Sequence, residues 1–200
     1  MSFEHRIPRR ADFDVVCEWV PQGASVLDLG CADGALLDRL MQTRGTRGYG
    51  VEIDSRQVLA ALRRGINVIQ SDLESGLSFF GSRSFDVVVL SQTLQATRNT
   101  EALIDEVLRI GRSAIVTLPN FGHWQVRWQL GIGGRMPVSR RLPYQWYDTP
   151  NIHFSTLRDF EVFCMERHIA IVRMQALAGG KPIRWLPNIR GDTTVLQIRR

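Results

Sequence analysis

The sequence predicts an α/β protein with a doubly wound, Rossmann-like sheet that is mostly parallel and covered by helices on both faces. Short runs rich in Val, Ile and Leu alternate with amphipathic stretches along most of the chain. The runs "DVVVL" and "AIVTL" are apolar almost throughout, which is typical of central parallel strands buried on both sides. The 200 residues have 44% hydrophobic content, enough for one well-filled core, so we expect residues 1–200 to form a single domain.

Seven segments have the length and composition of strands. In chain order they are Ser25–Leu29, Gly48–Glu52, Asn67–Gln70, Phe85–Ser91, Ala114–Leu118, Ile169–Gln175 and Thr193–Ile198. Only the last two lack an intervening helix. We therefore expect them to form an antiparallel hairpin at the sheet edge, joined by the loop "ALAGGKPIRWLPNIRGD".

The segments between these strands have the spacing of amphipathic helices. The predicted helices are Asp12–Trp19, Ala35–Thr43, Arg56–Arg64, Glu101–Ile110 and Thr156–Arg167. Ser155 or Thr156 is available as the N-cap of the last one, because a hydroxyl can accept a hydrogen bond from a free N–H of the first turn.

Residues 119–151 interrupt the alternation. This stretch contains four prolines and several aromatic residues, and it has no strong periodicity beyond a short helix near 124–130. Long irregular segments inside compact domains are usually functional or disordered, and the aromatic content argues against disorder. We predict an aromatic-rich cap inserted in the domain.

Charge and cysteine content limit the class of protein. Cys17, Cys31 and Cys164 are widely separated and form no C-x-x-C pair, so we expect reduced thiols and no metal site. The net charge of +5 comes mostly from arginine and is compatible with nucleic acid or with acidic protein surfaces, although a solvated arginine-rich surface is the preferred explanation.

The apolar runs are far shorter than the roughly 20 residues of a membrane span. The first residues, "MSFEHRIPRRADFD", carry charges where a secretory signal would need an apolar segment. We expect a cytoplasmic protein.

The stretch "SVLDLGCADGALLDRL" joins the first strand to the next helix through a sharp turn. Gly30 and Gly34 bracket the turn, and the helix directs its N-terminus toward it. In doubly wound sheets this first strand-turn-helix unit is the favoured place for a ligand. We predict that the turn is a ligand site, although glycine can also serve helix-strand packing alone.

Polar residues follow the neighbouring strands at the same edge of the sheet. Glu52 ends the second strand, where an acid commonly accepts hydrogen bonds from ribose hydroxyls. Asp72 follows the third strand and could receive an adenine amino group while Leu73 packs on the ring. Ser91 and Gln92 follow the fourth strand. Their convergence on one edge favours a nucleoside ligand.

The turn does not suit a nicotinamide dinucleotide. The dinucleotide fingerprint is G-x-G-x-x-G, whereas this chain has Gly30-x-x-x-Gly34. Asp33 would also repel a pyrophosphate at the helix N-terminus. A sulfonium cofactor with a free amino group suits the acids Asp28 and Asp33 better, because it brings positive charge and no phosphate.

The segments "VLDLGCADG", "GVEID", "SDLE" and "FDVVVLS" resemble the successive motifs of class I S-adenosylmethionine-dependent methyltransferases. That resemblance implies a seven-stranded sheet with an antiparallel last strand. It also implies that Asp28 and the 30–34 turn hold the methionine part of the cofactor, Glu52 the ribose, and Asp72 with Leu73 the adenine. The predicted site for S-adenosylmethionine or S-adenosylhomocysteine therefore comprises Asp28, Gly30, Cys31, Ala32, Asp33, Gly34, Glu52, Ile53, Asp72, Leu73, Ser91 and Gln92.

Longer motifs downstream narrow the resemblance. "LSQTLQAT", "LPNFGHW", "GRMPVSRRLPYQWYDTPNIHF" and "DFEVFC" are similar to the methionine biosynthesis protein MetW family over nearly the whole chain. This resemblance implies a bacterial cytoplasmic protein that acts with a MetX-type homoserine O-acetyl- or O-succinyltransferase. The family turn usually has glycine where this chain has Ala32, whose methyl group can crowd a cofactor.

The sequence leaves methyl transfer open. "SQTL" differs from the Asn/Asp-Pro-Pro-Tyr signature of enzymes that methylate exocyclic or amide nitrogens, and no Pro-Cys pair of the cytosine-C5 enzymes is present. His123 is a candidate general base, and a capping or packing role is the simpler interpretation. Candidate substrate or partner contacts are Trp124, Arg127, Tyr144, Trp146, Tyr147 and His153; the aromatic residues among them could equally form a small satellite core.

Three functions follow from these patterns. The preferred one is a cofactor-binding protein of methionine biosynthesis that supports or regulates a homoserine O-acyltransferase, with the cofactor acting as a feedback signal. The second is an active small-molecule methyltransferase that uses the same site. The third, suggested by the charge and by Arg140 and Arg141, is an RNA binder or RNA methyltransferase; the arginines are spread along the chain, so it ranks last.

Overall fold

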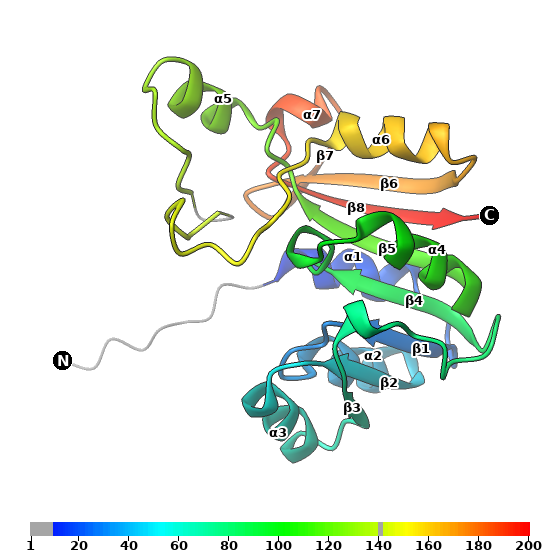
Figure 1. Cartoon of the computed structure of the whole chain (residues 1–200). Helices are drawn as coiled ribbons and strands as arrows, with labels where there is room; N and C mark the ends of the chain where they lie inside the picture. Colours follow the sequence, from blue (N-terminus) through cyan, green and yellow to red (C-terminus); the bar gives the residue numbers. More distant parts are fainter. Residues whose placement is uncertain (1–9, 140–141) are drawn as a thin grey trace.

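The computed structural model describes residues 10–139 and 142–200. The Arg140–Arg141 pair, on which the RNA hypothesis partly rests, lies outside these residues. The described chain forms an eight-stranded sheet of order β3-β2-β1-β4-β5-β8-β6-β7, with helices on both faces (Figure 1). The strands are β1 (Ser25–Leu29), β2 (Arg47–Glu52), β3 (Val68–Gln70), β4 (Phe85–Ser91), β5 (Gly111–Pro119), β6 (Ala170–Ala178), β7 (Lys181–Ile183) and β8 (Thr193–Arg199).

Helices connect most of these strands. The α-helices are α1 (Ala11–Trp19), α2 (Ala35–Arg44), α3 (Ser55–Arg63), α4 (Thr100–Ile110), α5 (Trp124–Gly131), α6 (Leu157–Glu166) and α7 (Pro187–Arg190). Two short 3₁₀ helices, η1 (Leu73–Ser75) and η2 (Leu94–Ala96), follow β3 and β4. Thr156 is the N-cap of α6 and forms a capping box with Asp159, which satisfies two free N–H groups at the start of this helix.

The sheet has the predicted topology. β1 to β5 pair in parallel, and β8 runs antiparallel between β5 and β6. The expected pairing of the last two predicted strands is confirmed, with Ile171 opposite Ile198. The implied count of seven strands is wrong by one, because β7 pairs with the end of β6. Gly179 and Gly180 both have positive φ, the geometry of a tight two-residue hairpin turn.

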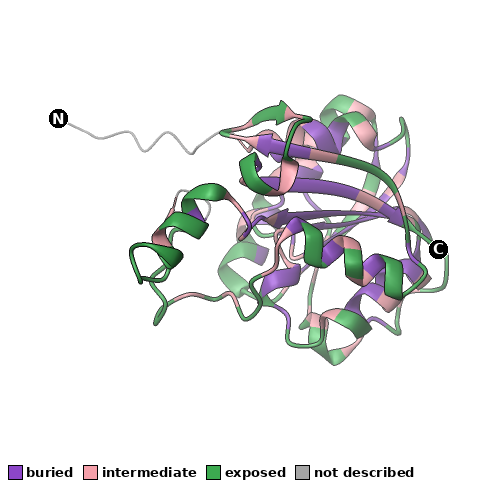
Figure 2. Ribbon diagram, turned by 90° about the horizontal axis from the view of Figure 1, so that it is seen from above, coloured by how far each residue is buried: buried purple, intermediate pink, exposed green. Residues whose placement is uncertain are grey.

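The core lies on both faces of the central strands. Leu27, Val88 and Val116 face a cluster with α4 and α6, and the alternate residues Val26 and Val87 face a second cluster with α1 and α2. Alternation along the strands sends successive side chains to opposite faces. Figure 2 shows the buried strands between helices whose outer sides are exposed. The three cysteines are free, as predicted, and all three are buried.

The 119–151 segment leaves the sheet after β5 and carries α5. Figure 1 shows α5 projecting away from the body of the sheet. Val126 and Leu142 are buried, whereas most of the large apolar side chains of the segment are exposed. Among the described residues, no helix combines the length and the apolar character needed to span a bilayer.

Candidate functional site

The turn between β1 and α2 has the left-handed geometry that favours glycine. Gly30, Ala32 and Gly34 have φ values of 76°, 48° and 75°. A Cβ atom at Gly30 would lie 2.6 Å from the Thr93 hydroxyl oxygen, and one at Gly34 would lie 2.9 Å from Cγ1 of Ile66. Neighbouring side chains therefore require both glycines, whether or not a ligand binds.

The Glu52 carboxylate links the turn to the end of β2 through hydrogen bonds. Its Oε2 accepts a hydrogen bond from the Ala32 N–H at 2.9 Å. Its Oε1 accepts from the N–H groups of Ile53 and Asp54 at 2.8 and 3.0 Å. A carboxylate offers about four acceptor positions, so roughly one remains for a ribose hydroxyl.

Asp28 lies in β1 beneath the turn and is 1% exposed. Its Oδ1 has no hydrogen-bond partner among the described residues. Burial raises the pKa of the Asp28 carboxyl to about 7; Arg10 opposes this shift and Glu52 adds to it. A buried acceptor of this kind calls for a donor, preferably a cationic one.

The other acids of the turn region have partners within the protein. Asp33 accepts a 2.5 Å hydrogen bond from Nη2 of Arg64. This ion pair reduces the negative charge at the turn, so the expected repulsion of a pyrophosphate by Asp33 is weaker than the sequence suggests. Cys31 remains a neutral thiol, because burial and then Asp28 raise its pKa to about 12.

The remaining predicted cofactor residues lie at the carboxyl ends of β3 and β4. Asp72 is exposed and caps η1 by accepting from the Glu74 N–H at 2.9 Å. Leu73 packs partly against the core. The Ser91 hydroxyl accepts from Nη2 of Arg10 at 2.8 Å, and Gln92 has a left-handed φ of 57°.

The contacts join only part of the predicted set. Glu52 contacts the turn at Ala32. Arg10 donates to the Ser91 hydroxyl, and its charge acts on the pKa of Asp28. The hydrogen bonds of the Asp72 carboxylate stay within its own turn. Arg10 and Thr93 belong to the site region and were missed, because their proximity arises from tertiary folding and no local motif marks it.

His123 is the N-cap residue of α5, but its side chain makes no capping hydrogen bond. The imidazole packs against Trp124 with ring centroids 5.8 Å apart. Burial lowers the pKa of His123, with Asp192 acting in the opposite direction. The ring is therefore neutral at pH 7, the form that can accept a proton.

The predicted substrate or partner contacts do not line one pocket. Trp146 and Tyr147 are 71% and 70% exposed and contact each other edge to face. Arg127 is exposed, and its Nε donates to the Gly122 carbonyl at 2.6 Å. Tyr144 lines a small space with Trp146 of about 20 Å³, which holds about one water molecule.

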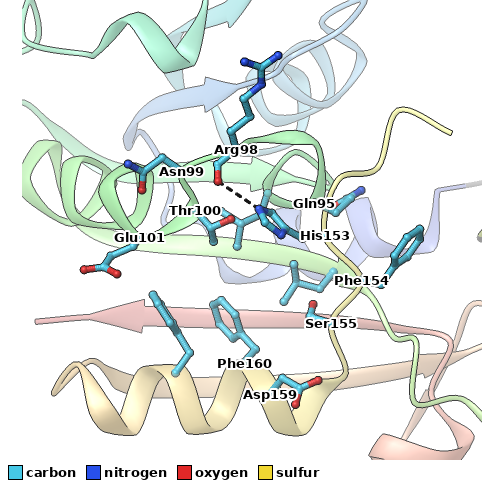
Figure 3. Close-up of a pocket in the computed structure, with 13 residues that line it drawn as sticks. Gln95, Arg98, Asn99, Thr100, Glu101, His153, Phe154, Ser155, Asp159 and Phe160 are labelled. Carbon is cyan, nitrogen blue, oxygen red and sulfur yellow. Dashed lines mark hydrogen bonds between the residues drawn. The ribbon is translucent and has the colours of Figure 1, made fainter.

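His153 lies at a different hollow, between α4 and α6 (Figure 3). Its Nε2 is 3.2 Å from the Arg98 carbonyl oxygen. Since a carbonyl only accepts, Nε2 donates this hydrogen bond. His153 thus lines a different pocket from Tyr144 and Trp146.

The strand order and the reversed β8 define the class: the fold is that of class I S-adenosylmethionine-dependent methyltransferases, as the motifs predicted. A methyltransferase of this kind from Mesorhizobium loti has a TM-score of 0.69 and 15% identity, covering 95% of this chain and 98% of that one. The [4+2]-cyclase SpnF has a TM-score of 0.67 and 17% identity, covering 94% and 80%. The fold therefore does not by itself define the reaction.

Sequence similarity identifies the family. The family model described as methionine biosynthesis protein MetW matches residues 10–198, so the chain belongs to this family, as its long motifs indicated. A relative named bifunctional methionine biosynthesis protein MetXA/MetW, from Rhodopirellula baltica, is 35% identical over 207 residues, covering 97% of this chain and 33% of that protein. The chain thus spans about a third of the relative's length.

Proposed function

We propose that this protein binds S-adenosylmethionine or S-adenosylhomocysteine at the 30–34 turn and assists a MetX-type homoserine O-acyltransferase. The observation that supports cofactor binding is the buried Oδ1 of Asp28, which has no partner among the described residues. When bound, S-adenosylmethionine supplies a methyl group on a cationic sulfur. Asp28 would accept from the amino group of the methionine part, and Glu52 would use its remaining acceptor position for ribose.

The cofactor proposal is tested by calorimetry with each form of the cofactor. We expect Asp28→Asn to weaken binding about ten-fold or more, because a charge-assisted hydrogen bond contributes about 1.5–3 kcal/mol. Asp105→Asn, on the exposed face of α4 and paired with Arg200, is the matched control and should bind like the wild type. Equal affinity in all three proteins would remove Asp28 from the site.

The partner half is supported by the domain composition of the Rhodopirellula relative, whose name joins MetXA and MetW in one polypeptide. The 119–151 segment offers a surface for such a partner. Exposed Trp and Tyr side chains are typical of interface hot spots, and the space beside Tyr144 and Trp146 is too small for a substrate. We assign Trp146 and Tyr147 to contact with the acyltransferase.

Binding between the purified chain and a homoserine O-acyltransferase from the same organism tests the partner proposal. We expect Trp146→Ala and Tyr147→Ala to raise the dissociation constant about ten-fold or more each, as hot-spot truncations do. Tyr49→Ala is the control, since Tyr49 is 46% exposed on β2, away from the segment. Unchanged affinity for both segment variants would exclude this surface.

We further propose that cofactor occupancy alters acylation, since two ligands that favour one state of a complex are coupled reciprocally. Acylation rate and complex formation should change between zero and saturating S-adenosylmethionine. If both stay constant, the feedback role is lost while the binding proposals stand.

Methyl transfer is a second candidate, favoured by the neutral imidazole of His123. Incubation with methyl-labelled cofactor and cell metabolites should give a labelled product if the protein is active, and His123→Asn should slow its formation by about 10²-fold or more if the ring is the base. Absence of product in repeated incubations would leave the accessory role.

A further inference from the structure

A second hollow lies between the N-terminal end of α4 and one side of α6. It has a volume of about 420 Å³, and its lining includes Leu94, Leu118, Phe160 and Phe163. Figure 3 shows the start of α4, with Thr100 and Glu101, above α6, and the 153–155 segment alongside. The volume falls within the roughly 300–1,000 Å³ of small-ligand sites, so the hollow can accept a ring-sized molecule.

The 3₁₀ helix η2 and the residue before it separate this hollow from the 30–34 turn. Thr93 lies on the turn side, where its hydroxyl donates to the Leu29 carbonyl at 2.8 Å. Leu94 and Gln95 line the hollow. The Gln95 carbonyl accepts from the N–H groups of Ile152 and His153 at 2.8 and 3.0 Å. The hollow is thus built from different residues than the predicted cofactor site.

The charged groups around the hollow are satisfied within the protein or directed away from it. Glu101 pairs with Arg167. Asp159 accepts from the Thr156 N–H at 2.8 Å in the capping box. The guanidinium group of Arg98 points away from the hollow in Figure 3. A charged ligand would therefore lose hydration without gaining an opposite charge, and a neutral one is favoured.

Polar atoms remain that could bind one hydrogen-bonding group. The Ser155 hydroxyl faces the space between the helices in Figure 3. Nε2 of His153 donates to the Arg98 carbonyl, and in the tautomer that carries its only ring proton on Nε2 the Nδ1 atom is an acceptor. The hydroxyl oxygen of Thr100 is buried and has no partner within the described chain. Oε1 of Gln95, another lining residue, is also buried and has no partner among the described residues.

We propose that this hollow is a second small-molecule site, which takes a neutral ligand with a ring-sized apolar body and one hydroxyl or amide group. Phe160 and Phe163, stacked with centroids 6.0 Å apart, would pack against the body. Ser155 and His153 would bind the polar end. The site does not depend on cofactor binding or on the acyltransferase.

An NMR titration of the isolated full chain with 2-phenylethanol tests this proposal. We expect saturable amide shifts at residues 94–101 and 153–163. Phenethylamine and phenylacetate, which share the ring but carry a charge, should bind about five-fold more weakly because their charged groups find no partner. Shifts centred on residues 28–34, or tighter binding of either charged probe, would overturn the assignment.

Ser155→Leu is the variant that blocks the hollow. Position 155 precedes the N-cap Thr156, and Phe160 is four residues beyond that cap. A hydrophobic pair at these positions forms a staple that stabilises a helix start, so the variant should fold while the leucine occupies ligand space. We expect the dissociation constant of 2-phenylethanol to rise about ten-fold.

Two further proteins complete the experiment. Phe163→Ala removes one wall, and we expect about five-fold weaker binding from the lost aromatic contact. Ser78→Leu, at an exposed position away from the hollow, should bind like the wild type. Wild-type affinity in both Ser155→Leu and Phe163→Ala, or no saturable shift in the wild type, would refute the second site.

Discussion

Asp28→Asn should change how the stability of the protein depends on pH. The Asp28 carboxyl is buried, and its pKa is raised from 3.8 to about 7, chiefly by burial. A raised pKa in the folded state means that folding favours the protonated form. The stability contributed by this group is therefore fully present below about pH 4 and is lost as the pH rises through about 7.

The magnitude follows from the size of the shift. About three pKa units at 1.36 kcal/mol each give up to about 4 kcal/mol lost between pH 4 and pH 8. Asparagine cannot ionise, so the variant lacks this loss. The new amide hydrogens also need partners, but that cost does not vary with pH. The difference in unfolding free energy between variant and wild type is therefore diagnostic only through its change with pH.

Urea denaturation at half-unit steps from pH 5 to pH 8.5 measures this difference. The unfolding free energy of the variant should rise relative to that of the wild type by about 1.4 kcal/mol per pH unit up to about pH 7. Above this pH the difference between the two proteins should stay constant. Asp105→Asn, with an exposed carboxylate, should follow the wild-type curve. Curves for Asp28→Asn and wild type that remain parallel would refute the raised pKa and the unsatisfied burial from which it follows.

Three further substitutions test the geometry of the turn and of α6 by urea denaturation. Ala32→Gly should cost less than the usual loss of about 0.5–1 kcal/mol, or stabilise, because the φ of 48° penalises alanine; a loss beyond about 1 kcal/mol would contradict this geometry. Gly30→Ala should destabilise the protein by about 2–4 kcal/mol, because position 30 has a φ of 76° and the new Cβ would contact Thr93. The loss should be smaller in a Thr93→Ala background. Equal losses in both backgrounds would exclude the contact. Thr156→Ala should cost about 1 kcal/mol through loss of the N-cap, whereas the exposed Thr43→Ala should stay within about 0.5 kcal/mol; similar effects of the two would mean that the cap does not stabilise α6.

The sequence predicted the strands that are buried, because an apolar run bounded by polar turns has few alternatives. β4 was predicted with its observed bounds, Phe85–Ser91. β5 begins three residues before its predicted start, at Gly111, since pairing with β4 extends it through polar residues. β7 was missed, because a three-residue strand containing proline has little strand propensity and forms only where the Gly179–Gly180 turn folds it back onto β6.

The site was predictable to the extent that it follows from strand order. Parallel strands end at one edge, so the positions of Glu52 and Ser91 could be inferred from motif and topology. The contact of Thr93 with Gly30 and the ion pair of Arg64 with Asp33 depend on how loops and helices pack. The hollow between α4 and α6 likewise joins residues more than fifty positions apart, and no local pattern indicates it.

Some of the predicted cofactor residues stabilise the ligand-free protein through their own contacts, and Asp28 does not. Gly30 avoids a clash with Thr93, Glu52 accepts three N–H groups of its own chain, and Asp72 caps η1. The structural role of each of these residues would favour it even in a protein that binds no ligand. The buried acid Asp28 instead increasingly destabilises the ligand-free fold as the pH rises from about 4 to about 7, and groups with strongly perturbed pKa values cluster at functional sites. Cofactor affinity should therefore depend on Asp28 more strongly than on Asp72, and calorimetry of Asp28→Asn beside Asp72→Asn tests that order; a larger loss at Asp72 would place the ligand away from β1.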